Sequence, residues 1–369
     1  MPVPRPDLNP GDPVSRIETP ALIVDLDAFE ANLRTMADYA AKAGMRLRPH
    51  AKTHKCAEIA KRQMALGAVG VCCQKVGEAA ALVAGGVTDV LVSNEVIHPG
   101  KLACLMSLTG RARIGICVDS DLGLDRLIAA AAEAVAPVDV YVELEVGGHR
   151  CGVTDIADGL ALARRIADSN RLRFGGIHAY RGSAQHLRTA DERKAAIDEA
   201  AARAAEFAAG LARDGIEVPV VTGAGTGTFT NEASSGVYNE IQPGSYVFMD
   251  RDYADNVADP AAPRFHHSLF VLTSVMSRRD AFAVIDAGLK AHSIDSGFPI
   301  VADRPDLTFS EPSDEHGIIK GAALPQLGET LRLIPGHCDP TVNLYDWIVA
   351  VRGDKVADVW AIDARGALT

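Results

Sequence analysis

The basic cluster from Arg48 to Lys55 is the densest group of residues in the chain that could do chemistry. It contains two lysines and two histidines, and it begins at the end of a short predicted strand, Met45–Pro49. A lysine in a desolvated pocket can have its pKa lowered enough to form a Schiff base with an aldehyde, which is the chemistry that pyridoxal phosphate requires. A solvated basic loop is the alternative interpretation, because charge runs usually face water.

The glycine-rich segment Thr222–Thr228 follows a later predicted strand and could bind a phosphate group. Barrels commonly bind phosphate through backbone N–H groups in the loops after their last strands. A lone glycine-rich turn is more often structural. The prediction of a phosphate site therefore depends on both this loop and the candidate lysine following strands of the same barrel. We predict a cradle formed by Gly225, Thr226 and Gly227 and completed by Ser245 and Tyr246.

The segment Pro335–Thr341 contains two candidate metal ligands, His337 and Asp339. If this segment is extended, both side chains point to the same side while Cys338 points away. One imidazole and one carboxylate leave an open site, which suits Mg²⁺ or Mn²⁺ with several waters better than a closed zinc site with four protein ligands. From spacing alone, a hydrogen-bonded His–Asp pair is the alternative.

Arg150, Tyr180 and His186 follow two further predicted strands. All three are therefore expected on the edge of a barrel where the loops that follow the strands form active sites. Taken singly, Arg150 suits a surface ion pair, Tyr180 the core and His186 a helix cap.

The elements that must position these residues alternate between short apolar runs and Ala-rich segments with helical periodicity, such as Ala129–Val135 and Ala195–Leu211. Parallel strands wrapped by helices give this pattern, and a TIM-type (β/α)₈ barrel is its economical closure. The predicted strands are Ala21–Asp25, Met45–Pro49, Val69–Cys72, Val90–Val92, Ile114–Val118, Val138–Val142, Phe174–Ile177 and Val218–Val221.

The pattern changes near Arg251, where strand-like runs follow one another without long helical segments between them. These runs are Leu269–Val275, Phe282–Ile285, Thr330–Leu333 and Trp347–Val351. We therefore predict an α/β chain with a barrel that binds pyridoxal phosphate over residues 18–252. A mainly β domain over residues 253–369, with an N-terminal arm of residues 1–17, carries the predicted metal site.

Composition narrows the classes of function. Of the 369 residues, 48% are hydrophobic and 23% charged, which is typical of a globular protein and excludes large disordered regions. A formal net charge of −11 with scattered basic residues disfavours nucleic acid as a partner. No apolar run is long enough to span a membrane, and the polar, Pro-rich N-terminus is unlike a signal peptide, so we expect a cytoplasmic protein with reduced cysteines.

Taken together, these stretches resemble the D-threonine aldolase and 3-hydroxy-D-aspartate aldolase family, whose barrel is similar to that of alanine racemase. The resemblance runs from about Thr19 to Arg365. It is carried by Arg48–Lys52, Gly70–Val76, Arg150–Val153, Thr273–Ser277, Asp286–Lys290, Asp314–Gly317 and His337–Thr341. It implies an enzyme that uses pyridoxal phosphate and a divalent metal to split β-hydroxy-D-amino acids into glycine and an aldehyde, or glyoxylate.

The same resemblance implies a role for individual residues. Lys52, rather than Lys55, holds the cofactor, while Arg150 approaches its phenolic oxygen and Tyr180 and Gln74 line its ring. It also implies that His337 and Asp339 bind the metal, that His186 is the base that takes the proton of the β-hydroxyl, and that the protein is a homodimer.

Three other functions compete with the aldolase. D-Serine dehydratases of the same superfamily place a cysteine two residues after the metal-binding histidine, where this chain has Asp339, which favours the aldolase. A racemase needs a second base that cannot be assigned from the sequence. A non-catalytic pyridoxal-phosphate carrier consists of the barrel alone. The sequence leaves open whether D-threonine, 3-hydroxy-D-aspartate or a phenylserine-like compound is preferred.

Overall fold

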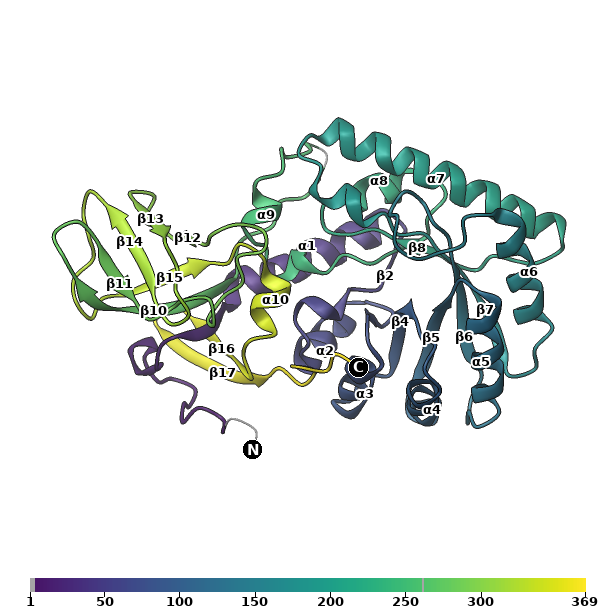
Figure 1. Cartoon of the computed structure of the whole chain (residues 1–369), viewed down its shortest axis with the longest axis horizontal. Helices are drawn as coiled ribbons and strands as arrows, with labels where there is room; N and C mark the ends of the chain where they lie inside the picture. The colour runs from purple at the N-terminus through teal and green to yellow at the C-terminus, as the bar shows by residue number, and fades with distance from the viewer. Residues whose placement is uncertain (1–3, 261) are drawn as a thin grey trace.

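The computed structural model describes residues 4–260 and 262–369 and consists of a barrel beside a mainly β domain (Figure 1). The barrel has eight parallel strands in the order β2-β9-β8-β7-β6-β5-β4-β3. The amide N–H of Val69 donates to the carbonyl of Leu47, and that of Cys72 donates to Pro49, which joins the two ends of this order. The strands are β2 (Arg46–Leu47), β3 (Val71–Cys73), β4 (Asp89–Glu95), β5 (Arg113–Val118), β6 (Val138–Glu143), β7 (Leu172–His178), β8 (Val221–Gly223) and β9 (Glu240–Ile241).

Helices follow the strands around the barrel (Figure 1). They are α1 (Leu26–Lys42), α2 (Ala57–Ala65), α3 (Val76–Ala84), α4 (Pro99–Leu108), α5 (Asp121–Ala131), α6 (Ile156–Ala167), α7 (Ala190–Arg213), α8 (Phe229–Ser234) and α9 (Arg251–Ala254). Short 3₁₀ turns lie at η1 (Val14–Arg16), η2 (Ala51–Thr53), η3 (Gly182–His186) and η4 (Ser245–Val247). The predicted (β/α)₈ barrel with a second, mainly β domain is confirmed.

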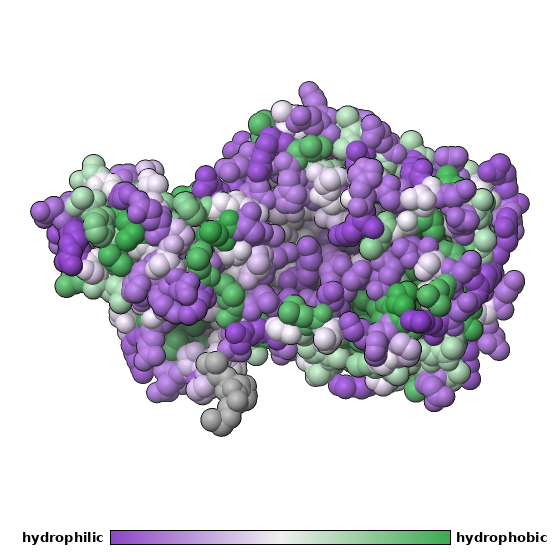
Figure 2. Space-filling model, viewed as in Figure 1, coloured by the Kyte–Doolittle hydropathy of each residue, from purple (hydrophilic) through white to green (hydrophobic). Residues whose placement is uncertain are grey.

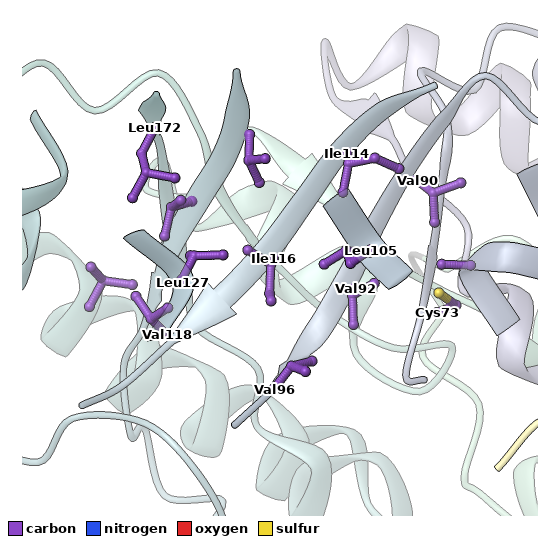
Figure 3. Close-up of a cluster of buried hydrophobic side chains, with 14 of the residues drawn as sticks. Cys73, Val90, Val92, Val96, Leu105, Ile114, Ile116, Val118, Leu127 and Leu172 are labelled. Atoms are coloured by element: carbon purple, nitrogen blue, oxygen red, sulfur yellow. The ribbon is translucent and has the colours of Figure 1, made fainter. Parts of the chain in front are cut away.

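Alternation along the barrel strands separates two cores. Val90, Val92, Ile114 and Ile116 pack outward against the helices, with Leu105 of α4 among their neighbours (Figure 3). The residues between them point inward, where Cys72, Leu91, Cys117, Tyr141 and Val220 fill the barrel. Because side chains alternate across a strand, each barrel strand contributes to both cores. The polar candidate residues lie beyond the strand ends, in the loops.

The second domain is built on a nine-stranded sheet with the main order β13-β14-β11-β10-β1-β16-β17, in which β15 also pairs with β10 and β12. Its elements are β1 (Ala21–Asp25), β10 (Leu269–Arg278), β11 (Ala283–Ile285), β12 (Ile300–Val301), β13 (Leu307–Ser310), β14 (Gly317–Gly321), β15 (Thr330–Ile334), α10 (Cys338–Val342), β16 (Trp347–Arg352) and β17 (Lys355–Ala361). The domain limits at residues 252 and 253 stay a prediction.

One predicted barrel strand was wrong. Ala21–Asp25 pairs with β10 and β16 of the second domain, and the two-residue β9 takes the place that it was expected to fill. Helix α1 nevertheless leads from β1 into the barrel, so the chain crosses between the domains at its beginning as well as near residue 252 (Figure 1). No helix of the described residues is long and apolar enough to cross a membrane.

Buried ion pairs join the strands near their N-terminal ends. The Arg48 side chain is only 2% exposed; it donates to Glu240 Oε1 at 3.0 Å and to Asp89 Oδ1 at 2.6 Å. Asp89 opens β4 and Glu240 opens β9, so one guanidinium connects the two strands that flank β3 and β2 in the closed barrel. The interpretation of this basic cluster as a solvated loop is therefore wrong.

Replacing Arg48 by methionine is expected to lower the free energy of unfolding by about 3–5 kcal/mol, because it removes the buried cation that Glu240 and Asp89 share and leaves them the more exposed Arg46 and Arg113. Urea unfolding followed by circular dichroism measures this difference. Arg34→Met is the matched control, since Arg34 is exposed and lies 3.8 Å from Glu30, and it should change stability by less than about 1 kcal/mol. Equal effects of the two substitutions would contradict this role for Arg48.

Candidate active site

A cavity of about 360 Å³ lies where the loops after the barrel strands meet α10 of the second domain. Figure 2 shows the surface hollowed between the two domains, with mainly hydrophilic residues around the hollow. The cavity brings together ten of the residues that the sequence singled out. They are Lys52, Gln74, Arg150, Tyr180, His186, Gly225, Thr226, Ser245, His337 and Asp339.

Two predicted cradle residues do not line this cavity. The N–H of Gly227 donates to Gln185 Oε1 at 2.9 Å, and Gly227 borders a separate cavity behind the loop. The Tyr246 hydroxyl accepts a hydrogen bond from Gln63 at 3.1 Å, and its ring is buried. A Cβ at Gly225 would lie 2.4 Å from Gln185 Oε1, so this glycine is required by packing against η3.

Lys52 lies in η2, directly after β2, and its amine lines the cavity. Lys55, three residues later, pairs with Glu78 at 3.2 Å and is not part of the cavity wall. The turn therefore places Lys52 at the cavity and Lys55 against Glu78. The spacing of the two lysines in the sequence does not predict this difference. Of the two, Lys52 is the amine that a ligand in the cavity can reach.

The charge on Lys52 is stabilised by Asp339, whose Oδ2 lies 3.2 Å from Nζ. This carboxylate raises the pKa of Lys52 above its usual value, against the opposing effect of burial. The expectation that desolvation lowers the pKa of this lysine is therefore wrong for this arrangement. Burial would raise the pKa of Asp339, but Lys52 and His337 outweigh it and lower that pKa to about 2.

His50 and Gln74 form one wall of the cavity. Gln74 Nε2 lies 2.9 Å from His50 Nε2 and donates to the carbonyl of Ser93, while His50 Nδ1 accepts from the amide of Lys52 at 3.3 Å. Burial and the nearby Lys52 hold the pKa of His50 well below its usual value, so this imidazole is neutral. The sequence did not single out His50, although it lies two residues before Lys52 in the same basic cluster.

A second histidine, His178 at the end of β7, lies deeper in the cavity wall. Its Nδ1 is 3.2 Å from Glu143 Oε2, and its Nε2 is 3.3 Å from Gln242 Oε1. Burial would lower the pKa of His178, but Glu143 outweighs it and raises that pKa. His178, Glu143 and Cys117 bring ligand atoms within 4.8 Å of one another, so this buried group is a second place that could hold a metal.

The two predicted metal ligands border the cavity, but not as an extended segment. His337 precedes α10 with an extended backbone, and Asp339 lies in the first turn of that helix. His337 Nδ1 is 2.8 Å from Asp295 Oδ2, and Ser293 donates to the other oxygen of Asp295 at 2.7 Å. Both side chains reach the cavity because the chain turns into α10 between them. The extended segment expected from the spacing is not observed.

The remaining predicted residues come from the loops after β6 and β7. The Arg150 guanidinium lies 5.7 Å from the centroid of the Tyr180 ring, and burial raises the pKa of Tyr180. His186 closes η3 and its Nδ1 is 2.7 Å from Asp252 Oδ2. Asp252, like Asp295, is far from its partner along the chain, and no local signal in the sequence singled it out.

Comparison with known proteins first gives the class of protein. The family described as alanine racemase, N-terminal domain, matches residues 24–252, and the putative serine dehydratase domain matches residues 268–351. The barrel and the mainly β domain beside it define an alanine-racemase-like class of protein.

Closer relatives give the family. A D-threonine aldolase of Arthrobacter sp. is 49% identical over 98% of this chain and 96% of its own length, and a 3-hydroxy-D-aspartate aldolase of Paracoccus denitrificans is 46% identical over 97% and 94%. The crystal structure of D-threonine aldolase from Filomicrobium marinum is 49% identical and superposes with a TM-score of 0.96 over 98% of this chain and 99% of that one. The chain belongs to the D-threonine aldolase and 3-hydroxy-D-aspartate aldolase family. This confirms the resemblance found in the sequence and, with it, the prediction of a lyase.

Proposed function

We propose that the protein is an aldolase that uses pyridoxal phosphate and a divalent metal to cleave β-hydroxy-D-amino acids into glycine and an aldehyde, or glyoxylate. The observation that carries this proposal is the meeting of Lys52, His186 and the His337–Asp339 pair in one cavity. An amine that can bind an aldehyde, an imidazole that can accept a proton and two ligands for a cation are the groups that this cleavage needs.

The cavity fits pyridoxal phosphate. Its volume of about 360 Å³ is within the usual range for small-molecule sites, and the Lys52 amine faces into it. Thr226 and Ser245 offer hydroxyl and backbone groups for the phosphate, and Gly225 allows the chain to turn beside them. We assign Arg150, Tyr180 and Gln74 to the region around the ring. Gly227 and Tyr246 support the loop from behind.

When bound, pyridoxal phosphate supplies an electron-withdrawing ring that takes up the electron pair of the breaking Cα–Cβ bond. The protein supplies the proton transfer. We assign the removal of the β-hydroxyl proton to His186, which lines the cavity. Because His50 is neutral, it does not oppose the effect of Asp339, which raises the pKa of Lys52, so the amine must lose a proton before it can bond to an aldehyde.

We place the catalytic metal at His337 and Asp339 rather than at the buried Cys117–Glu143–His178 group. Two protein ligands on a cavity wall leave positions for the substrate and for water, as a catalytic ion needs. An imidazole and a carboxylate suit Mn²⁺ or Mg²⁺. Cys117, Glu143 and His178 are buried, and of these three only His178 borders this cavity, so they leave less room for a substrate and water than His337 and Asp339 do.

Asp295 is expected to orient His337 for the metal, because a carboxylate on Nδ1 leaves Nε2 free as a ligand. Asp295→Asn should weaken Mn²⁺ binding by about 10–100-fold. Titration of Mn²⁺ followed by electron paramagnetic resonance measures the dissociation constant directly. Asp314→Asn is the matched control, since the Asp314 side chain is exposed and its carboxylate lies 4.0 Å from Lys290 Nζ. An unchanged dissociation constant in Asp295→Asn would argue against this assignment.

A dehydratase of the same superfamily is the competing function. A D-threo-3-hydroxyaspartate dehydratase of Delftia sp. is 29% identical, well below the aldolases. Incubation of purified protein with D-threonine, L-threonine and D-serine separates these reactions. Glycine from D-threonine alone supports the proposal, whereas ammonia and a keto acid from D-serine would identify a dehydratase.

We also propose a homodimer and a cytoplasmic location. Support for the location comes from the seven cysteines, all of which are unpaired, as is usual in reducing compartments. A dimer in which the β domain of one subunit closes the cavity of the other accords with a cavity at the domain junction. Analytical ultracentrifugation distinguishes it from a monomer.

A further inference from the structure

We propose that Asp252 is a positioning residue that holds the His186 imidazole with a proton on Nδ1 and a free lone pair on Nε2. This inference rests on the proposed function, because it explains how His186 is prepared to take a proton from the substrate. The two residues meet where η3, which carries His186, contacts α9, which carries Asp252. This contact involves neither the cofactor nor the metal.

The carboxylate of Asp252 is placed between two side chains. Its Oδ2 lies 2.7 Å from His186 Nδ1, and its Oδ1 accepts from Arg188 at 2.6 Å. The Asp252 side chain is 8% exposed, whereas that of His186 is 49% exposed, which places the carboxylate behind the imidazole. The Tyr253 ring, 5.9 Å from the His186 ring, also borders the cavity.

The short contact between Nδ1 of His186 and Oδ2 of Asp252 then indicates the tautomer. An ionised carboxylate can only accept hydrogen bonds, so the nitrogen that faces it must carry the proton. A neutral imidazole has one N–H and one lone pair, which leaves the lone pair on Nε2. Because His186 lines the cavity, a base held in this tautomer is ready to accept a proton there, and the carboxylate stabilises the imidazolium that results.

Arg188 gives the carboxylate its own support. Besides Oδ1 of Asp252, it donates to the backbone carbonyl of Asp252 at 2.6 Å and to Asn256 Oδ1 at 2.9 Å. Asn256 in turn donates to the carbonyl of Gln185 at 3.0 Å. These bonds join η3 to α9 without the His186 contact, so removing the charge of Asp252 should leave the two segments docked.

Asp252→Asn tests the assignment, because an amide of the same shape can donate to Nδ1 and favour the wrong tautomer. We expect kcat for glycine formation to fall by about 10²–10⁴-fold, the usual value of a positioned base, with KM changed by less than roughly threefold. Asp252→Glu should recover part of the loss. Asp255→Asn is the matched control, since Asp255 is half exposed and pairs only loosely with Arg251 at 3.6 Å.

A double substitution separates positioning from a merely structural role. If Asp252 acts through His186, then Asp252→Asn in a His186→Ala background should lower kcat by less than about threefold further. An additional loss as large as in the native background, or a fall in thermal stability that accounts for the loss, would overturn the proposal. Failure of the proposed function would look different, because the native protein itself would then form no glycine.

Discussion

Lys52→Ala is expected to lower kcat by about 10⁴–10⁶-fold, the size of loss that follows removal of a nucleophile from an enzyme. The variant should also lose the visible absorbance of bound pyridoxal phosphate, because Lys52 is the cavity amine able to bond to the aldehyde. Assays of glycine formation and absorption spectra of the purified variant give both results.

Mapping the modified lysine provides the control for this prediction. Borohydride reduction of the native protein with its cofactor, followed by peptide mass spectrometry, should place the pyridoxyl group on Lys52. Modification of Lys55 would contradict the assignment, and it is not expected because Lys55 is buried against Glu78 at 3.2 Å. Lys61→Ala, on the exposed face of α2, should keep the activity of the native protein.

Asp339→Asn is expected to weaken Mn²⁺ binding by more than about 100-fold, since even residues that only support a metal ligand are worth roughly 10–100-fold. Activity at limiting Mn²⁺ should fall by a similar factor. Isothermal titration with Mn²⁺ measures the first effect and glycine formation the second. Because Asp339 also contacts Lys52 at 3.2 Å, the variant must be shown to retain the cofactor spectrum.

Cys117→Ala is the matched control for the metal. Cys117 belongs to the buried group with Glu143 and His178, the other place among the described residues that could hold an ion. We expect this substitution to leave Mn²⁺ affinity unchanged, because the sulfur lies among the inward-facing barrel residues. Loss of metal from Cys117→Ala with retention in Asp339→Asn would reverse the assignment of the two sites.

Much of the barrel could be predicted because each strand–helix unit is local in sequence. The run Ala21–Asp25 followed by α1 looks like such a unit, but its partners are β10 and β16, which lie far along the chain. No periodicity within the run reveals this pairing. In the same way β9 is only Glu240–Ile241, too short for an alternation to be visible.

The candidate site could be assembled from the sequence only where its residues lie close together along the chain. The cluster around Lys52 and the pair His337–Asp339 are short segments, and the cavity contains both. Asp252 and Asp295 could not be found in this way, because each meets its histidine through folding rather than through spacing. Gly227 was predicted to bind the phosphate, but its N–H donates to Gln185 Oε1 instead. The composition of the loop does not show which of its N–H groups are already bonded within the protein.

The central claim is that this cavity breaks the Cα–Cβ bond of a β-hydroxy-D-amino acid with the help of a divalent metal. Its most direct test follows glycine, acetaldehyde and ammonia together as purified, cofactor-loaded protein acts on D-threonine after chelation and again after addition of Mn²⁺. We predict equal amounts of glycine and acetaldehyde, no ammonia, and activity that is lost on chelation and restored by Mn²⁺. Ammonia in place of glycine, or glycine formation that ignores the metal, would contradict this account.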